Sequence, residues 1–196
     1  MRIFLAGASG AIGRQLVPLL SAAGHEVAGM TRSPEKAEML RELGAEPVVV
    51  DVYDASALVE AVVAFEPELV MHQLTDLPPS AAEIAAKGGA ANARIRTEGT
   101  RNLLAAAAAP EGEPRLIAQS IAWRLPGDAH RSVDEHEAMV LDAGGVVLRY
   151  GRFYGPGTYH PDDGDRPEPP AIHVAEAARR TVELLDAEPG TVEVIE

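Results

Sequence analysis

The sequence predicts an α/β fold in which helices cover both faces of a parallel sheet of about seven strands. Short apolar runs alternate with longer segments of helical period along all 196 residues. The runs are aliphatic and β-branched, as is typical of strands that are buried on both faces. Such alternation predicts a doubly wound sheet with right-handed crossovers. The length fits a single domain, residues 1–196, with little or no separate C-terminal domain.

Seven of the apolar runs are predicted strands. In chain order they are Ile3–Gly7, Glu26–Thr31, Pro47–Val52, Leu69–Thr75, Arg115–Ser120, Val146–Tyr150 and Thr191–Ile195. Two other stretches, Pro126–Arg131 and Gly155–Pro170, are rich in proline, glycine and aspartate, and are predicted loops.

The segments between the strands have helical period. The predicted helices cover residues 12–23, 33–43, 55–65, 92–109, 132–142 and 174–187. Ser33 followed by Pro34 is typical of a helix N-cap, and Asp54 is a second predicted cap.

Composition excludes several classes of protein. The formal net charge of −13 argues against a nucleic-acid binder, which neutralises phosphates with Lys and Arg. No run approaches the roughly 20 apolar residues of a membrane span, and the N-terminus lacks the pattern of a signal peptide. The absence of cysteine excludes disulfides and thiolate chemistry. We therefore expect a cytoplasmic protein without nucleic-acid or membrane partners.

The turn after the first predicted strand contains three spaced glycines, Gly7, Gly10 and Gly13. In a strand–turn–helix context this spacing predicts a dinucleotide site. The first glycine allows a sharp turn, the second lets the backbone approach the pyrophosphate, and the third lets the helix pack closely on the strand. The free N–H groups of the helix face the phosphates. The residues between the glycines belong to the same predicted site: Ser9, Ala11 and Ile12. The fold is therefore expected to be Rossmann-like and NAD(P)-binding.

The end of the second strand favours NADP(H) over NAD(H), which stays the alternative. NAD-binding proteins usually place an acidic residue there for the ribose 2′-hydroxyl. This chain has Thr31, Arg32 and Ser33 instead. A guanidinium can pair with the 2′-phosphate, and the two hydroxyls can donate hydrogen bonds to it.

The order of the motifs resembles the short-chain dehydrogenase/reductase superfamily, in its extended and atypical branches that include NAD-dependent epimerases and dehydratases. The resemblance rests on Gly-x-x-Gly-x-x-Gly and on residues 51–52, 70–74, 98–104, 148–157 and 172–178. It implies adenine contacts from Asp51 and Val52. It also implies contacts to the nicotinamide end from Leu74, Ser120, Tyr150, Gly151 and Phe153.

The chain departs from this family in its catalytic residues. The superfamily reduces carbonyls with a serine and a Tyr-x-x-x-Lys pair, in which lysine lowers the tyrosine pKa. Ser120 matches the serine, but no lysine follows Lys87, so the pair is absent. Ser120, Tyr154 and His136 are the predicted catalytic residues, and Trp123 and Tyr159 are further candidates. Each has a structural alternative; for His136 it is an exposed position on a helix.

The resemblance implies an NADPH-dependent oxidoreductase that reduces a ketone or enone of a small or aromatic metabolite. Atypical reductases of this kind resemble polyketide-tailoring ketoreductases of secondary metabolism. Two alternatives stay open: a non-catalytic, NADP(H)-binding redox sensor, and a sugar-nucleotide epimerase or dehydratase.

The remaining predictions concern partners. The substrate is expected to be a small molecule. Its pocket is expected to be small or open, or to be completed by the Gly155–Pro170 loop or by a neighbouring subunit. The protein is expected to be a monomer or a homodimer. No metal site is predicted, because the six histidines are scattered and the acidic run Asp162, Asp163 and Asp165 fits a solvated loop better.

Overall fold

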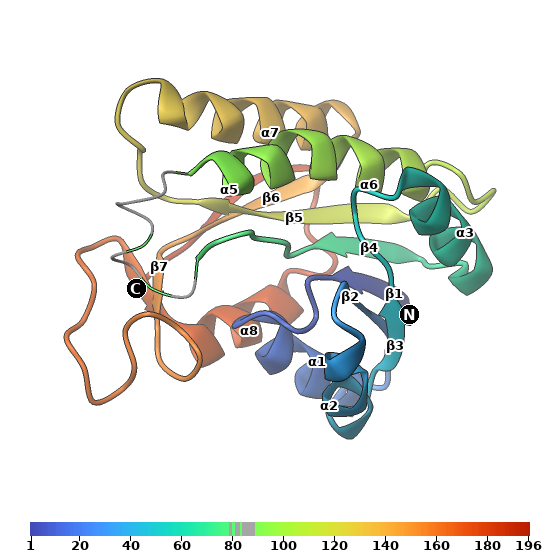
Figure 1. The fold of residues 1–196 in the computed structure, drawn as a ribbon, viewed down its shortest axis with the longest axis horizontal. Helices are drawn as coiled ribbons and strands as arrows, with labels where there is room; N and C mark the ends of the chain where they lie inside the picture. The colour runs from blue at the N-terminus through green and yellow to red at the C-terminus, as the bar shows by residue number, and fades with distance from the viewer. Residues whose placement is uncertain (79, 81–82, 84–88) are drawn as a thin grey trace.

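The computed structural model describes residues 1–78, 80, 83 and 89–196. Within these residues, seven parallel strands form one sheet in the order β3-β2-β1-β4-β5-β6-β9 (Figure 1). The strands are β1 Arg2–Ala6, β2 Glu26–Thr31, β3 Glu46–Val49, β4 Leu69–His72, β5 Arg115–Ile121, β6 Val146–Tyr150 and β9 Gly190–Val194. The predicted fold class is confirmed.

The strand order reverses at β1, which pairs with β2 on one side and with β4 on the other. Ala6 at the end of β1 is in register with Met30 of β2 and with His72 of β4. Open α/β sheets bind ligands outside the carboxyl ends of their strands, at such a reversal point. The fold therefore places the predicted site where the loops after β1, β2 and β4 meet.

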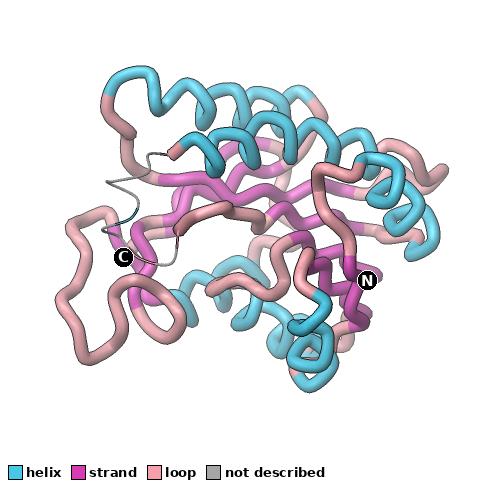
Figure 2. Tube along the Cα trace, in the orientation of Figure 1, coloured by secondary structure: helices cyan, strands magenta, loops and turns pink. Residues whose placement is uncertain are grey.

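Helices cover both faces of the sheet (Figures 1 and 2). One face carries α1 Gly13–Ala22, α2 Ala37–Glu42 and α8 Val174–Glu183. The other carries α3 Ala55–Phe65, α5 Ala90–Arg94, α6 Thr100–Ala107 and α7 Arg131–Asp142. Short helical turns are η1 Pro34–Lys36, η2 Ile95–Gly99 and η3 Gly127–His130. The η2 turn has π geometry and joins α5 to α6, so the helix predicted over 92–109 is irregular in its middle.

The core has two layers because successive strand residues point to opposite faces. In β1, Leu5 packs in the layer that contains Leu16 of α1, whereas Phe4 packs in the layer that contains Leu58 of α3. All four side chains are fully buried.

Two short strands stand directly before and after the predicted loop Gly155–Pro170. β7 Arg152–Tyr154 pairs in parallel with β8 Ala171–His173 and forms a separate two-stranded sheet. Three residues are too few to show an alternating pattern, so neither strand could be predicted. Asp54 caps α3 through the Ala57 N–H at 3.1 Å, as predicted, whereas the Ser33 side chain makes no cap hydrogen bond.

Of the helices in the described residues, none has the length and apolar character needed to cross a membrane. The prediction that residues 1–196 form one domain stays a prediction.

Candidate functional site

The turn between β1 and α1 is closely packed against neighbouring backbone. Gly7 has a φ of 91°, and a Cβ atom there would lie 2.4 Å from the carbonyl oxygen of Gln73. At Gly13 a Cβ atom would lie 2.3 Å from the carbonyl oxygen of Gly7. Neither position can hold a side chain without moving the backbone.

The N-terminus of α1 is available to a phosphate group. Its N-cap, Ile12, makes no side-chain cap hydrogen bond, and no acidic residue stands in the first turn. The first N–H groups of a helix lack partners within the helix and carry a partial positive charge. The turn therefore fits the pyrophosphate of a dinucleotide.

A smaller cavity of about 270 Å³ lies at the carboxyl ends of β1, β2 and β3. The predicted cofactor residues that line it are Gly7, Ser9, Gly10, Thr31, Arg32, Ser33, Asp51, Val52 and Leu74. The polar residues on its wall that the sequence analysis missed include Lys36, Tyr53 and Asp76. Tyr53 has a buried hydroxyl with no hydrogen-bond partner among the described residues, which leaves one polar atom for a ligand.

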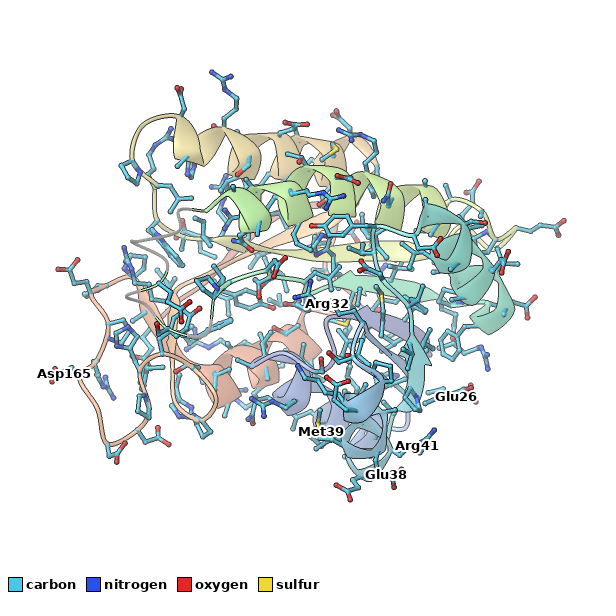
Figure 3. The ribbon with its side chains drawn as sticks, viewed as in Figure 1. Glu26, Arg32, Glu38, Met39, Arg41 and Asp165 are labelled. Atoms are coloured by element: carbon cyan, nitrogen blue, oxygen red, sulfur yellow. The ribbon has the colours of Figure 1, made fainter. Side chains whose placement is uncertain are left out.

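Arg32 lies in the middle of the molecule in Figure 3, whereas Glu38 and Arg41 lie at its outer edge on α2. Its guanidinium is paired with Asp76 at 3.2 Å, and the Arg32 side chain is 59% exposed. Asp76 follows β4, and its N–H donates to Asn92 Oδ1 at 3.0 Å. A phosphate must compete with Asp76 for Arg32. An exposed pair of this kind contributes about 0–1 kcal/mol, so the competition is weak.

A larger cavity of about 830 Å³ adjoins the smaller one, and Gly10, Gln73, Leu74, Thr75 and Leu77 line both. The predicted residues that line it are Gly10, Ala11, Ile12, Leu74, Ser120, Tyr150, Gly151 and Phe153, together with His136, Trp123 and Tyr159. Of the predicted cofactor residues, Gly13 alone lines neither cavity and serves to pack the turn. Part of the predicted loop, residues 157–160, also lines the larger cavity.

Ser120 is held by two residues that the sequence analysis did not select. Its hydroxyl donates a short hydrogen bond to Glu137, and Arg149 binds the same carboxylate through Nε at 3.0 Å and through Nη2. Burial alone would raise the pKa of Glu137, but the hydrogen bonds from Arg149 and Ser120 and the charge of Arg149 hold it below its ordinary value. The Ser120 proton therefore faces a carboxylate rather than the cavity.

His136 is 1% exposed, so the expectation of a helix-surface position is wrong. Its Nδ1 lies 2.7 Å from Thr100 Oγ1 and its Nε2 lies 2.9 Å from the carbonyl oxygen of Gln119. Thr100 Oγ1 is also 3.1 Å from Nε2 of buried His72, whose Nδ1 accepts from the Leu74 N–H at 3.3 Å.

The hydrogen-bond partners of His72, Thr100 and His136 show which atom carries each proton. His72 accepts at Nδ1, so its neutral ring donates from Nε2 to the Thr100 hydroxyl. Thr100 then donates to His136 Nδ1. The ring of His136 therefore carries its proton on Nε2 and donates it to the carbonyl oxygen of Gln119. Burial lowers the pKa of both histidines, and that of His72 falls well below its ordinary value with a further contribution from His136. Both rings are neutral hydrogen-bond links and leave no nitrogen free for a substrate.

Tyr150 is also committed to internal partners. Its hydroxyl lies 2.7 Å from Thr181 Oγ1 and 3.3 Å from Gln73 Nε2, which donates to it. Thr181 gives its own proton to the carbonyl oxygen of Ala177 at 2.7 Å, so Tyr150 donates to Thr181. Burial raises the pKa of Tyr150 to about 12.

The structure does not bring Tyr154 to the cavity. Its hydroxyl donates to Glu196 at 2.6 Å, and its ring contacts the ring of His173. Tyr159 reaches the cavity, but its hydroxyl donates to the carbonyl oxygen of Pro78. Trp123 forms part of the wall, with the guanidinium of Arg152 4.6 Å from the centre of its ring. Of these three aromatic residues, Trp123 and Tyr159 thus line the cavity, whereas Tyr154 does not.

Side chains that can bind a metal ion are not grouped in the described residues: no set of three His, Asp or Glu residues has suitable positions. Asp165, of the acidic run predicted as a solvated loop, lies at the edge of the molecule in Figure 3.

Comparison with known proteins agrees with the geometry. The model of a family described as NAD(P)H-binding matches residues 7–144. A 3-diazoavenalumate denitrifying reductase from a Streptomyces species is 40% identical over 194 residues, which cover 84% of this chain and 60% of that protein. The chain thus spans less than two thirds of this relative.

Solved structures show the same fold at lower identity. UDP-glucose 4-epimerase from Thermus thermophilus, in complex with NAD, is 20% identical with a TM-score of 0.79 over 100% of this chain and 78% of that one. A putative epimerase from Burkholderia cenocepacia J2315 is 21% identical with a TM-score of 0.77 over 99% and 75%. These structures confirm the predicted Rossmann-like fold, and the family model shows that the chain is of the NAD(P)H-binding family.

Proposed function

Because the chain belongs to the NAD(P)H-binding family, we propose that it is an NADPH-dependent reductase whose substrate accepts hydride without a proton from the protein. The observation that carries this proposal is that four polar groups on the wall of the larger cavity already donate their protons within the protein. The protons of Ser120, Tyr150 and Tyr159, and that of His136, are each donated to a protein acceptor. None of these four groups is free to protonate an alkoxide.

The residues of the smaller cavity support NADPH as the cofactor. Arg32 stands directly after β2, where an NAD-binding protein usually has an acid, and Lys36 of η1 adds a second cationic side chain to the wall. The turn at Gly7 and the open N-terminus of α1 would hold the pyrophosphate. When bound, NADPH supplies a hydride.

An aromatic diazo compound is the substrate class that this arrangement favours. The Streptomyces relative is named for denitrifying reduction of a diazo compound. In the reaction that we propose for this chain, an arenediazonium ion gains a hydride with its electron pair and loses N₂, so Ar–N₂⁺ and NADPH give Ar–H, N₂ and NADP⁺. No oxygen anion forms, and therefore no Tyr-Lys pair is needed.

The ketone or enone reduction predicted from the sequence fits these residues less well. It generates an alkoxide or enolate that has to be protonated, and general acids contribute about 10²–10⁴-fold to such steps. Epimerisation or dehydration of a sugar nucleotide also calls for a base. A sensor without catalysis stays the alternative that needs no proton transfer.

The test is NADPH consumption with four substrate classes after NADPH binding has been measured by calorimetry. The panel contains arenediazonium salts, aromatic ketones, enones and quinones. We expect turnover of a diazonium salt with release of one N₂ per NADPH, at least about 100-fold faster than turnover of any ketone. The Gly7→Ala variant, which should not bind NADPH, measures the uncatalysed reduction.

Two results would contradict the proposal. Ketone turnover as fast as diazonium turnover would mean that an efficient proton donor exists. Tight NADPH binding without turnover of any class would favour the sensor.

A further inference from the structure

Among the described residues, those that line the larger cavity include cationic side chains but no acidic ones. Two arginines, Arg96 and Arg152, line it, whereas none of the described residues on its wall is Asp or Glu. The whole chain has 30 acidic and 17 basic residues and a formal net charge of −13. The charge of this cavity is therefore opposite in sign to that of the protein that surrounds it.

Arg96 differs from Arg152 in its partners. The guanidinium of Arg152 donates to the carbonyl oxygens of Glu168 and Pro169 at 3.2 and 3.1 Å and stacks on Trp123. In the part of the chain that the structure describes, no hydrogen bond or ion pair holds the side chain of Arg96. Arg96 stands in the π turn η2, midway along the helical segment from α5 to α6.

The nearby carboxylate of Glu137 does not neutralise Arg96. Glu137 acts on Arg96 through space, but its oxygens are bound by Ser120 and by Arg149. Burial lowers the pKa of Arg96, so the ionised guanidinium is partly desolvated where it stands. A partly buried cation without a counter-ion is costly, and an anionic ligand that pairs with it offsets that cost.

The rest of the wall accommodates a flat apolar body. Trp123, Phe153 and Tyr159 contribute aromatic rings, and Leu77 and Leu125 contribute aliphatic surface. A volume of about 830 Å³ lies within the range of small-molecule sites, about 300–1,000 Å³. The wall thus combines aromatic and aliphatic surface with the unpaired cation of Arg96.

We propose that the substrate is an aromatic carboxylic acid whose carboxylate pairs with Arg96. The proposal rests on the proposed function, because it assigns the specificity of the same cavity. A guanidinium binds a carboxylate with two parallel hydrogen bonds, which fixes the orientation of the ligand as well as its charge. Arg96 is thus a substrate-binding residue and takes no part in hydride transfer.

The experiment measures binding rather than turnover, so it does not depend on the diazo chemistry. The protein saturated with NADP⁺ is titrated calorimetrically with cinnamate and with cinnamamide, which have the same aromatic body. We expect cinnamate to bind about 10- to 100-fold more tightly, the range for a charge-assisted hydrogen bond. In Arg96→Gln this preference should disappear while NADP⁺ affinity stays unchanged.

The matched control is Arg101→Gln. Arg101 stands on α6, in the same helical segment, and pairs with Glu135 at 3.5 Å on the outside of the molecule. This variant should keep the preference for the acid. Arg96→Lys should keep part of it, because a lysine retains the charge but not the bidentate geometry.

Equal affinity of the wild-type protein for cinnamate and cinnamamide would overturn the proposal, and this result does not require any variant to fold. A preference that survives in Arg96→Gln, or that is lost only in Arg152→Gln, would also overturn it. If cinnamate binds through Arg96 but no diazonium salt is reduced, the proposed reaction fails while the anion site stands.

Discussion

The two adjoining cavities are built in different ways. Backbone forms much of the smaller one, in the glycine turn and the open end of α1, and Arg32 on its wall is paired with Asp76 and well exposed. The larger cavity is surrounded by side chains that bind one another. One series of hydrogen bonds runs from His72 through Thr100 and His136 to the carbonyl oxygen of Gln119. A second group joins Ser120, Glu137 and Arg149. The first arrangement suits a ligand that many proteins share, whereas the second would hold the substrate in the reaction that we propose.

The largest expected effect is at the backbone turn. Gly7→Ala should weaken NADPH binding by more than about 100-fold, because the new Cβ atom would overlap the carbonyl oxygen of Gln73 and displace the turn. Gly24→Ala is the matched control: Gly24 also has a positive φ, 82°, but a Cβ atom there meets nothing within 4 Å. Calorimetric titration with NADPH should show a loss for the first variant only. Equal affinities in both would mean that the turn does not hold the cofactor.

The next effect concerns cofactor choice. Arg32→Ala should weaken NADPH binding by about 1.5–3 kcal/mol, the contribution of a charge-assisted hydrogen bond, and leave NADH binding nearly unchanged. Arg41→Ala, on the outer edge of α2, should change neither affinity. Asp76→Asn should strengthen NADPH binding slightly, since Arg32 no longer has to leave an ion pair. Equal losses for NADPH and NADH in Arg32→Ala would exclude the assignment to NADP(H).

A smaller effect is expected from the buried histidines. The folded-state pKa of His72 and His136 is lowered, so below about pH 6.5 the unfolded chain binds protons that the folded chain does not. Their contribution to stability is therefore complete above that pH and is lost as the pH falls, by about 1.4 kcal/mol per pH unit for each histidine. Urea unfolding between about pH 7 and about pH 5.5 should show this slope, and His136→Gln should reduce it. An unchanged slope in the variant would show that other groups cause it.

These cavities also differ in how far sequence could predict them. The residues of the smaller one follow strand ends in short contiguous motifs, so Gly7, Arg32 and Asp51 were predicted together with the fold. Glu137 and Arg149 are brought to Ser120 by α7 and β6, and sequence carries no signal for that contact. His136 looked like a surface residue because three of its neighbours on the helix are charged. Arg96 offered no signal, since its lack of a hydrogen-bond or ion-pair partner among the described residues is visible only in the folded protein.

The central claim is that hydride transfer needs no proton from the protein, and the pH dependence of that step tests it most directly. The measurement is the single-turnover rate of NADPH oxidation by a diazonium salt between about pH 7 and about pH 9. The pKa values of Glu137, His72 and His136 are lowered and that of Tyr150 is about 12, so none of these groups should titrate in the window. The account predicts a flat profile. A rate that falls as the pH rises through this range would reveal a protein acid in the transition state and contradict it.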